Sequence, residues 1–295
     1  MSHDILVTGA TGKTGGALAR RLKAAGLNAA GMTSRKDAAG AGDPVPLVYG
    51  DLRRPETLPD AFKGVKALYL VTPLGPDEPQ VGLGAIEAAE QAGVEKIVHL
   101  SIMNLEAMRE IPHFETKIPI KERLLKRGPH VVLGANFFMQ NDLMALPAIL
   151  HGGVYPLPVG GAGVWSIDVE DIALAAFNAL TSDDFDGSAV PLAGPQCVTG
   201  PRIAEVWSEA LGRPVIYPGD AIDPFIEALK ANIALDAWAE DDFRTMMAVT
   251  QRDGCPASEA DRAATRAVLG RSPTPYADFA ARTLAQTPTP DPQQG

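Results

Sequence analysis

Short apolar runs alternate with longer segments of helical periodicity through the first half of the chain. Several of these runs carry Val, Ile and Leu on both faces, as strands do when helices cover both sides of a sheet. The pattern predicts six strands, at residues 5–9, 28–34, 45–51, 66–73, 96–101 and 130–138.

The segments between these runs predict helices. After the first strand, Leu18, Leu22 and Ala25 recur at helical spacing, and Gly26 can end the helix in a left-handed conformation. A second helix is predicted over residues 80–92. Strands that alternate with helices of this length predict an α/β fold with a Rossmann-type, doubly wound parallel sheet.

The pattern changes near residue 150, where the stretch HGGVYPLPVGGAG is rich in turn-forming residues. We assign residues 1–150 to the Rossmann domain. Residues 151–285 mix helices with short strands, and we expect mostly a smaller α/β substrate-binding region over the carboxyl edge of the sheet, partly interleaved with it. Residues 286–295 form a polar, proline-rich tail, which predicts disorder.

Composition narrows the classes of function. The chain has 295 residues, 46% of them hydrophobic, which is enough for one large domain or two closely joined ones. A formal net charge of −10 without a long basic run argues against nucleic acid and anionic membranes as partners and favours a small-molecule substrate. No signal peptide or membrane helix is predicted, so we expect a cytoplasmic protein. A homo-oligomer is possible, although no residue marks an interface.

The cysteines and histidines do not predict a metal site. Cys197 and Cys255 lie far apart and lack CxxC spacing, which favours two reduced thiols. The five histidines are scattered and form no HExxH motif.

A glycine-rich loop, DILVTGATGKTGG, follows the first predicted strand. Its letters GKT suggest a P-loop, but that motif needs a glycine five positions before Gly12, where Val7 stands. The loop instead reads G-x-x-G-x-x-G through Gly9, Gly12 and Gly15. At a strand end and helix start, such glycines allow backbone N–H groups and the helix dipole to bind a dinucleotide pyrophosphate. The domain at residues 1–150 is therefore predicted to bind NAD(P).

Three further residues complete the predicted phosphate-binding loop: Thr11, Lys13 and Thr14. Lys13 either approaches the phosphates or lies on the helix surface. The alternative for the whole loop is a glycine turn without a ligand.

The end of the second strand indicates which dinucleotide binds. An acidic residue there would bind the ribose hydroxyls of NAD, but this chain has Arg35 and Lys36. Both side chains can donate to an adenosine 2′-phosphate, and the planar fork of arginine suits that group. We therefore predict NADP(H) in preference to NAD(H). The alternative is that both are solvated charges, opposed by Asp37.

Ligands of open α/β sheets bind outside the carboxyl ends of the strands, so later strand ends should line the same crevice. We expect Asp51 and Leu52 near the adenine, Thr72 and Pro73 near the central phosphates and ribose, and Ser101 near the nicotinamide.

The chain resembles the NmrA-like family, an atypical branch of the short-chain dehydrogenase/reductases. The matching stretches run in family order from the first strand to about Val215: VTGATGKTGG, GDLRRPETLPDAFKGVKALYLVTP, HFETK, ANFFMQN, VEDIA and EALGRPV. The resemblance implies the fold and the cofactor class. Other members of the wider superfamily use Tyr-x-x-x-Lys, and here His113 replaces the tyrosine while Lys117 is present. By resemblance, Lys117 positions the nicotinamide ribose or acts in proton transfer.

His113 has two interpretations. A histidine exchanges protons near neutral pH, so His113 is a candidate proton donor to the substrate; the alternative is a partly exposed loop histidine. The two side chains share a face if the segment is helical. Because Pro119 would break a helix interior, we expect the regular helix to begin near Thr116, which can cap it.

The ANFFMQN stretch closes the sixth predicted strand, and the resemblance assigns its residues to the site. Asn136 and Phe137 are expected near the nicotinamide, whereas Phe138, Met139 and Asn141 are expected to shape the substrate pocket. On physical grounds alone, Phe-Phe-Met is more often packing.

These features favour an NADPH-dependent reductase that transfers hydride to a small, aromatic, electrophilic acceptor: a quinone, an azo or imine bond, an enone or a benzylic ether. The alternative is an NADP(H)-binding redox sensor without turnover, which the missing tyrosine favours. A nucleotide-sugar epimerase ranks last, because the second strand ends in basic residues and Tyr-x-x-x-Lys is absent.

Overall fold

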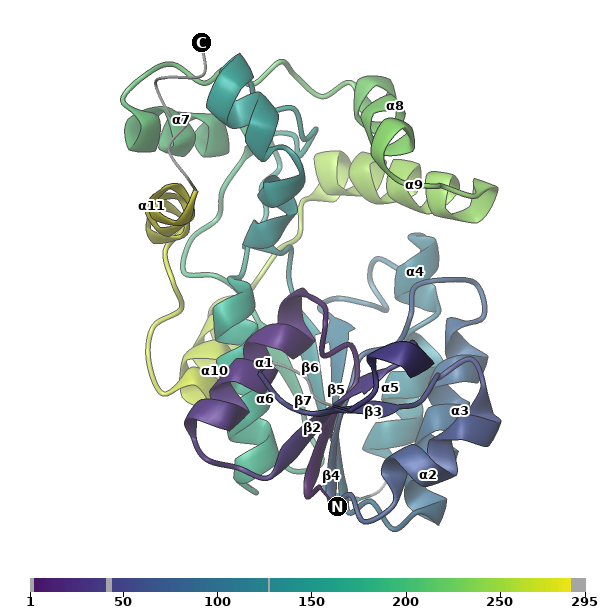
Figure 1. Cartoon of the computed structure of the whole chain (residues 1–295). Coiled ribbons are helices and arrows are strands. Elements are labelled where there is room, and N and C mark those ends of the chain that lie inside the picture. Colours follow the sequence, from purple (N-terminus) through teal and green to yellow (C-terminus); the bar gives the residue numbers. More distant parts are fainter. Residues whose placement is uncertain (1–2, 41–43, 127, 288–295) are drawn as a thin grey trace.

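Seven parallel strands form one sheet in the order β3-β2-β1-β4-β5-β6-β7 in the computed structural model, which describes residues 3–40, 44–126 and 128–287 (Figure 1). The strands are β1 (Ile5–Val7), β2 (Ala29–Thr33), β3 (Leu47–Tyr49), β4 (Ala67–Leu70), β5 (Lys96–Ile102), β6 (Val131–Ala135) and β7 (Ala189–Leu192). The first six confirm the predicted strands, most of them with shorter ends. The order reverses between β1 and β4, and a crevice for ligands opens at such a switch point.

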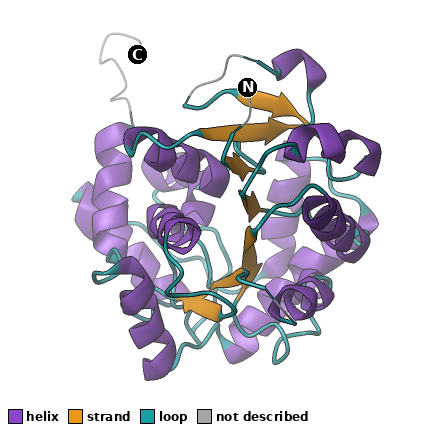
Figure 2. Cartoon of the chain, turned by 90° about the horizontal axis from the view of Figure 1, so that it is seen from below, coloured by secondary structure: helices purple, strands orange, loops and turns teal. Residues whose placement is uncertain are grey.

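Helices cover both faces of the sheet, which confirms the doubly wound fold (Figure 2). One face carries α1 (Lys13–Ala24), α6 (Val169–Thr181) and α10 (Glu259–Leu269). The other carries α2 (Leu58–Phe62), α3 (Glu78–Gln91) and α5 (Ile118–Leu125). Short 3-10 turns, η1 (Lys36–Ala38) and η2 (Pro55–Thr57), follow β2 and β3.

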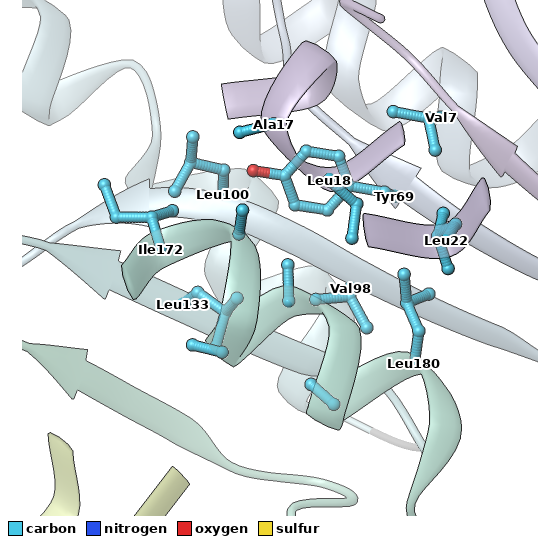
Figure 3. Close-up of a cluster of buried hydrophobic side chains, with 14 of the residues drawn as sticks. Val7, Ala17, Leu18, Leu22, Tyr69, Val98, Leu100, Leu133, Ile172 and Leu180 are labelled. Carbon is cyan, nitrogen blue, oxygen red and sulfur yellow. The ribbon is translucent and has the colours of Figure 1, made fainter. Parts of the chain in front are cut away.

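The α1 helix shows how the sequence sets these contacts. Leu18 and Leu22 are fully buried against the sheet and α6, close to Tyr69 (Figure 3). Gly26 ends the helix at φ +69°, as predicted, and its N–H bonds the Lys23 carbonyl at 3.0 Å. The predicted third face residue, Ala25, is exposed because the buried face ends one turn earlier.

A second, largely helical region lies above the carboxyl ends of the strands (Figure 1). It consists of η3 (Met139–Met144), the π-helical turn η4 (Ala148–Gly152), α7 (Gly200–Leu211), α8 (Ile222–Asn232), α9 (Ala237–Asp253) and α11 (Tyr276–Gln286). Between these elements the chain returns to the sheet to form α6, β7 and α10. Of the predicted tail, residues 288–295 lie outside the described residues, and Gln286 ends α11.

The centre of this upper region is a buried carboxylate. Asp142 of η3 accepts hydrogen bonds from Tyr155 Oη and Trp207 Nε1, both at 3.0 Å, and from Tyr276 Oη. Burial raises the pKa of Asp142 to about 6, although the three donors act against this shift. One carboxylate therefore joins η3, α7 and α11.

None of the helices in the described part of the chain has both the length and the apolar character that a membrane span needs.

Candidate active site

The glycine loop has the geometry of a phosphate-binding turn. Gly9 adopts φ +62°, and the Gly12 N–H bonds the Gly9 carbonyl at 2.9 Å. A Cβ on Gly15 would lie 2.6 Å from Gly9 C, 2.9 Å from Thr8 O and closer still to Gly9 O, so only glycine fits there. Gly12 precedes α1 and provides no side-chain cap. The first amides of α1 are thus available to an anion.

A cleft of about 360 Å³ opens beside this loop. It brings together seven of the predicted cofactor residues: Gly9, Thr11, Arg35, Asp51, Leu52, Thr72 and Pro73. Its remaining lining comes from Thr8, Met32, Thr33, Ser34, Gly50, Arg53 and Val71. The other predicted cofactor residues do not line this cleft: Gly12, Lys13, Thr14, Gly15, Lys36, Ser101, Lys117, Asn136 and Phe137. The cleft crosses the switch point between β1 and β4, where an α/β sheet binds nucleotides.

Two guanidinium groups, those of Arg35 and Arg53, line the cleft. Arg35 is exposed, and its side chain makes no hydrogen bond or ion pair with any described residue. Arg53, which the sequence analysis did not identify, is held by Asp77 through two contacts of 2.8 and 3.0 Å. Lys36 instead lies over the Tyr49 ring, 6.0 Å from its centroid.

Lys13 reaches away from the loop toward the upper region. Its Nζ donates to the Gln140 carbonyl at 3.1 Å, and burial lowers its pKa. Lys13 was expected either beside the phosphates or on the helix surface, and this contact matches neither position. The side chain ties the start of α1 to η3.

The segment around Lys117 differs from the prediction. Two short helices, α4 (Pro112–Glu115) and α5, meet at Thr116, so this residue ends α4 and does not cap α5. Pro112 and Pro119 both occupy first turns, where proline is tolerated. Because the helix is interrupted, His113 and Lys117 do not share one helical face and have different partners.

Lys117 pairs with a buried carboxylate that the sequence analysis missed. Its Nζ contacts Glu78 Oε1, which also accepts from Thr72 Oγ1, while Thr116 Oγ1 donates to Glu78 Oε2 at 2.7 Å. The Glu78 side chain is 0% exposed. Since Thr72 lines the cofactor cleft, Glu78 connects Lys117 to the cleft wall.

Two polar groups of β5 lie in the same buried layer. Ser101 is 2% exposed, and its Oγ has no hydrogen-bond partner among the described residues. His99 bonds the Leu70 carbonyl through Nδ1 at 3.0 Å. Burial, with a smaller contribution from the Lys117 charge, lowers the pKa of His99 to about 3. His99 is therefore neutral at physiological pH.

An apolar pocket of about 350 Å³ lies next to the cofactor cleft. Pro73 lines the cleft and Leu74 lines the pocket, so the two hollows adjoin. Predicted residues in the lining are His113, Asn136, Phe137, Phe138 and Asn141. The other lining residues are Leu74, Ile102, Met103, Asn104, Met108, Phe114, Ala135, Asp242, Phe243, Met246, Thr250 and Cys255.

One predicted pocket residue lies elsewhere. Met139 is buried in the core of the upper region and does not line the pocket, because η3 begins there and turns the side chain into that core. Burial raises the pKa of the lining residue Cys255 to about 11, which keeps its thiol protonated at neutral pH. No Lys or Arg occurs among the described residues of the lining. The pocket therefore suits an uncharged ligand better than an anionic one.

His113 is bonded to the upper region. Asp242 of α9 lies 2.8 Å from His113 Nδ1 and 2.8 Å from its backbone nitrogen, through the same oxygen. Asp242 is 1% exposed. The residue is 129 positions away in the chain, so no local sequence pattern identifies it.

The sequence profile of the NmrA-like family matches residues 1–257. The chain is 34% identical to an NAD(P)H azoreductase from Xenophilus azovorans over 230 residues, which cover 76% of this chain and 80% of the relative. It is 32% identical to a (4-alkanoyl-5-oxo-2,5-dihydrofuran-3-yl)methyl phosphate reductase from Streptomyces griseus subsp. griseus over 290 residues, covering 94% and 96%.

Among solved structures, the chain is similar to an NADPH-dependent quinone oxidoreductase from Escherichia coli in complex with NADPH. The TM-score is 0.80 at 22% identity, over 95% of this chain and 99% of that one. At this identity the likeness establishes the fold.

Proposed function

This chain belongs to the NmrA-like family, and we propose that it is an NADPH-dependent reductase of small, aromatic, electrophilic acceptors. The observation that carries the proposal is the adjacency of the two hollows: Pro73 lines the cleft beside the glycine loop, and its neighbour Leu74 lines the apolar pocket. Such an arrangement holds a dinucleotide along the sheet edge with its reactive end facing a second ligand.

The cleft residues fit the cofactor. The Gly9–Gly15 loop supplies the amides for a pyrophosphate, and Arg35 is free to meet a 2′-phosphate. Bound there, NADPH supplies the hydride. We propose a preference for NADPH over NADH because Asp77 already engages Arg53, which leaves Arg35 as the cation available to the extra phosphate.

At the other end, Asn136 and Phe137 border the pocket and are proposed to meet the nicotinamide. The Asn136 amide is fixed, because Nδ2 donates to the Cys255 carbonyl at 3.0 Å and Oδ1 accepts the Phe137 N–H at 2.8 Å. Lys117 is proposed to bind the adjacent ribose. The carboxylate of Glu78 contacts both Lys117 and Thr72, which lines the cleft. Each group is held by the protein before the ligand arrives, which lowers the cost of orienting it.

The pocket lining limits the acceptor. Because no Lys or Arg lines it among the described residues, an anionic acceptor such as the phosphate ester named for the Streptomyces relative has no counter-charge. An uncharged aromatic acceptor can bury its surface against Phe137, Phe138 and Phe243. We therefore propose azo compounds and quinones as the first acceptors to test. A cytoplasmic location and a homo-oligomer stay predictions from the sequence.

The function is tested by measuring NADPH oxidation against a panel of quinones, azo dyes, imines and enones, together with equilibrium binding of NADPH and NADH. The proposal expects turnover of at least one uncharged aromatic acceptor and tighter binding of NADPH. Tight NADPH binding without oxidation across the panel would favour the alternative, a redox sensor, which the missing tyrosine at position 113 supports. Absence of NADPH binding contradicts both.

A further inference from the structure

We propose that Asp242 and His113 form a proton-delivery pair in the apolar pocket, in which Asp242 positions the imidazole and His113 passes a proton to the acceptor. The inference rests on the proposed reductase function. Both residues line the pocket and come from different regions, α4 beside the sheet and α9 above it (Figure 1). The pair therefore forms at the interface where α9 packs on α4.

The contact with Asp242 favours one tautomer of the ring. When Asp242 is ionised its carboxylate only accepts hydrogen bonds, and the 2.8 Å contact then places a proton on His113 Nδ1. The remaining nitrogen, Nε2, has no partner among the described residues and lies on the ring edge opposite Asp242. It is the atom that can exchange a proton with a ligand, as in other carboxylate–histidine pairs.

Burial makes the pairing strong. Asp242 is 1% exposed, and a lone buried carboxylate is costly unless it is paired and hydrogen-bonded. Its Oδ1 accepts two N–H groups of His113, from the ring and from the backbone, whereas its Oδ2 is buried without a hydrogen-bond partner among the described residues. No other charged side chain lines the pocket in the described chain, so His113 is the group there that can stabilise this carboxylate. The His113 ring also lies edge-on to Phe114, at a centroid distance of 4.7 Å, which restricts its rotation.

The pair supplies the proton that is needed to complete the reduction after hydride transfer. Reduction of an uncharged azo bond adds hydride to one nitrogen, and the electron pair displaced from the double bond goes to the other nitrogen. Protonated His113 donates its Nε2 proton to that second nitrogen, which forms the hydrazine and leaves a neutral imidazole. The ring then regains a proton from water, so atoms and electrons balance. A positioned acid of this kind contributes about 10²- to 10⁴-fold in rate.

The kinetic test uses Asp242→Leu, His113→Gln and the double variant, with 4-aminoazobenzene and menadione as uncharged acceptors. Each single variant should lower kcat by about 10²-fold with little change in KM or NADPH affinity, and the double variant should be no worse than His113→Gln. Asp242→Asn keeps an oxygen for the backbone N–H and should retain part of the activity. The exposed neighbour provides a control, Asp241→Asn, which should behave as wild type.

Unchanged kcat in either single variant, or losses that add in the double variant, would overturn the pair. A second readout does not need turnover: ¹⁵N NMR of histidine-labelled protein at alkaline pH, with His113 assigned from His113→Gln. The neutral ring should carry its proton on Nδ1 in the wild type and on Nε2 in Asp242→Leu. A neutral His113 ring that carries its proton on Nε2 in the wild type would also overturn the proposed pair. If the wild type reduces neither acceptor, the reductase proposal fails while the NMR result still decides the pairing.

Discussion

The ammonium of Lys117 rests on a carboxylate with no exposed surface, Glu78, and this contact governs how any Lys117 variant must be interpreted. Removing one partner of a buried ion pair leaves the other charge uncompensated. We therefore predict that Lys117→Ala lowers the free energy of unfolding by about 3–5 kcal/mol. The double variant Lys117→Met/Glu78→Gln should recover most of that loss, because neither charge remains.

Denaturant unfolding measures these effects. Lys121→Ala is the matched control, because Lys121 pairs with the more exposed Glu106 and should change stability by less than about 1 kcal/mol. If Lys117→Ala unfolds like the wild type, the buried pair does not form. Because the double variant should be nearly as stable as the wild type, its turnover shows whether Lys117 also takes part in the reaction.

The proposed preference for NADPH over NADH depends on Arg35. Arg35→Glu should weaken NADPH binding by about 10- to 100-fold, the range of a charge-assisted hydrogen bond, and should leave NADH binding much less affected. Lys36→Glu, one position further and away from the cleft lining, should have the smaller effect. Calorimetric titration of both cofactors tests this, and equal losses for NADPH and NADH would contradict the assignment.

The structure brings predicted residues together where their positions follow the order of the strands along the chain. Gly9, Arg35 and Thr72 each follow a strand, so counting along the sequence is enough to bring them to one edge. Glu78 and Asp242 were missed because their partners lie 39 and 129 positions away in the chain. Those pairs form through tertiary packing, and no periodic pattern in the nearby sequence reveals them.

At the scale of elements, the contact between β1 and α1 requires the glycine at position 15. Gly15→Ala should lower the free energy of unfolding by about 1–3 kcal/mol, because the added methyl group overlaps the backbone of Gly9. It should also weaken NADPH binding, since α1 must move away from the loop. Gly84→Ala in α3 is the control, where a Cβ meets nothing within 4 Å and the change should stabilise the helix by up to about 1 kcal/mol.

Thermal unfolding with and without NADPH distinguishes the two glycines. A Gly15→Ala protein as stable and as tightly binding as the wild type would show that the close approach of α1 to β1 is not needed.

The elements themselves were largely predictable, because their hydrophobic periods are local. All six predicted strands are present, and the α3 helix begins at Glu78, two residues earlier than expected. The regular helix was expected to begin near Thr116, but α5 begins at Ile118. Pro112 and Pro119 each occupy the first turn of a separate helix, so the segment forms two helices. β7 was not located, since its four residues carry little signal without the neighbouring β6.

Across the whole molecule, Asp142 couples the upper region to pH. Its pKa rises from 3.8 to about 6 on folding, so the folded state binds more protons than the unfolded state between these values. The stability that Asp142 contributes is therefore present below pH 4 and is lost as pH rises through 6. The destabilisation caused by Asp142→Asn should thus be smaller at pH 7 than at pH 4, by about 2–3 kcal/mol.

Unfolding free energies of the wild type and Asp142→Asn at both pH values test this coupling. His99 acts in the opposite direction in both proteins, since its lowered pKa removes stability as pH falls from 6.5 toward 3. Its contribution cancels in the difference between wild type and variant. A difference that does not change with pH would contradict a buried, titrating Asp142.

The proposed site joins the two regions of the molecule, with the proposed cofactor cleft on the sheet and the proposed acceptor pocket between the sheet and α9. A crystal structure of the NADPH complex tests this arrangement most directly. The account predicts the pyrophosphate on the Gly9–Gly15 loop, the 2′-phosphate beside Arg35 and the nicotinamide ring at Asn136, facing the pocket. A cofactor bound elsewhere, or a nicotinamide directed away from the pocket, would contradict it.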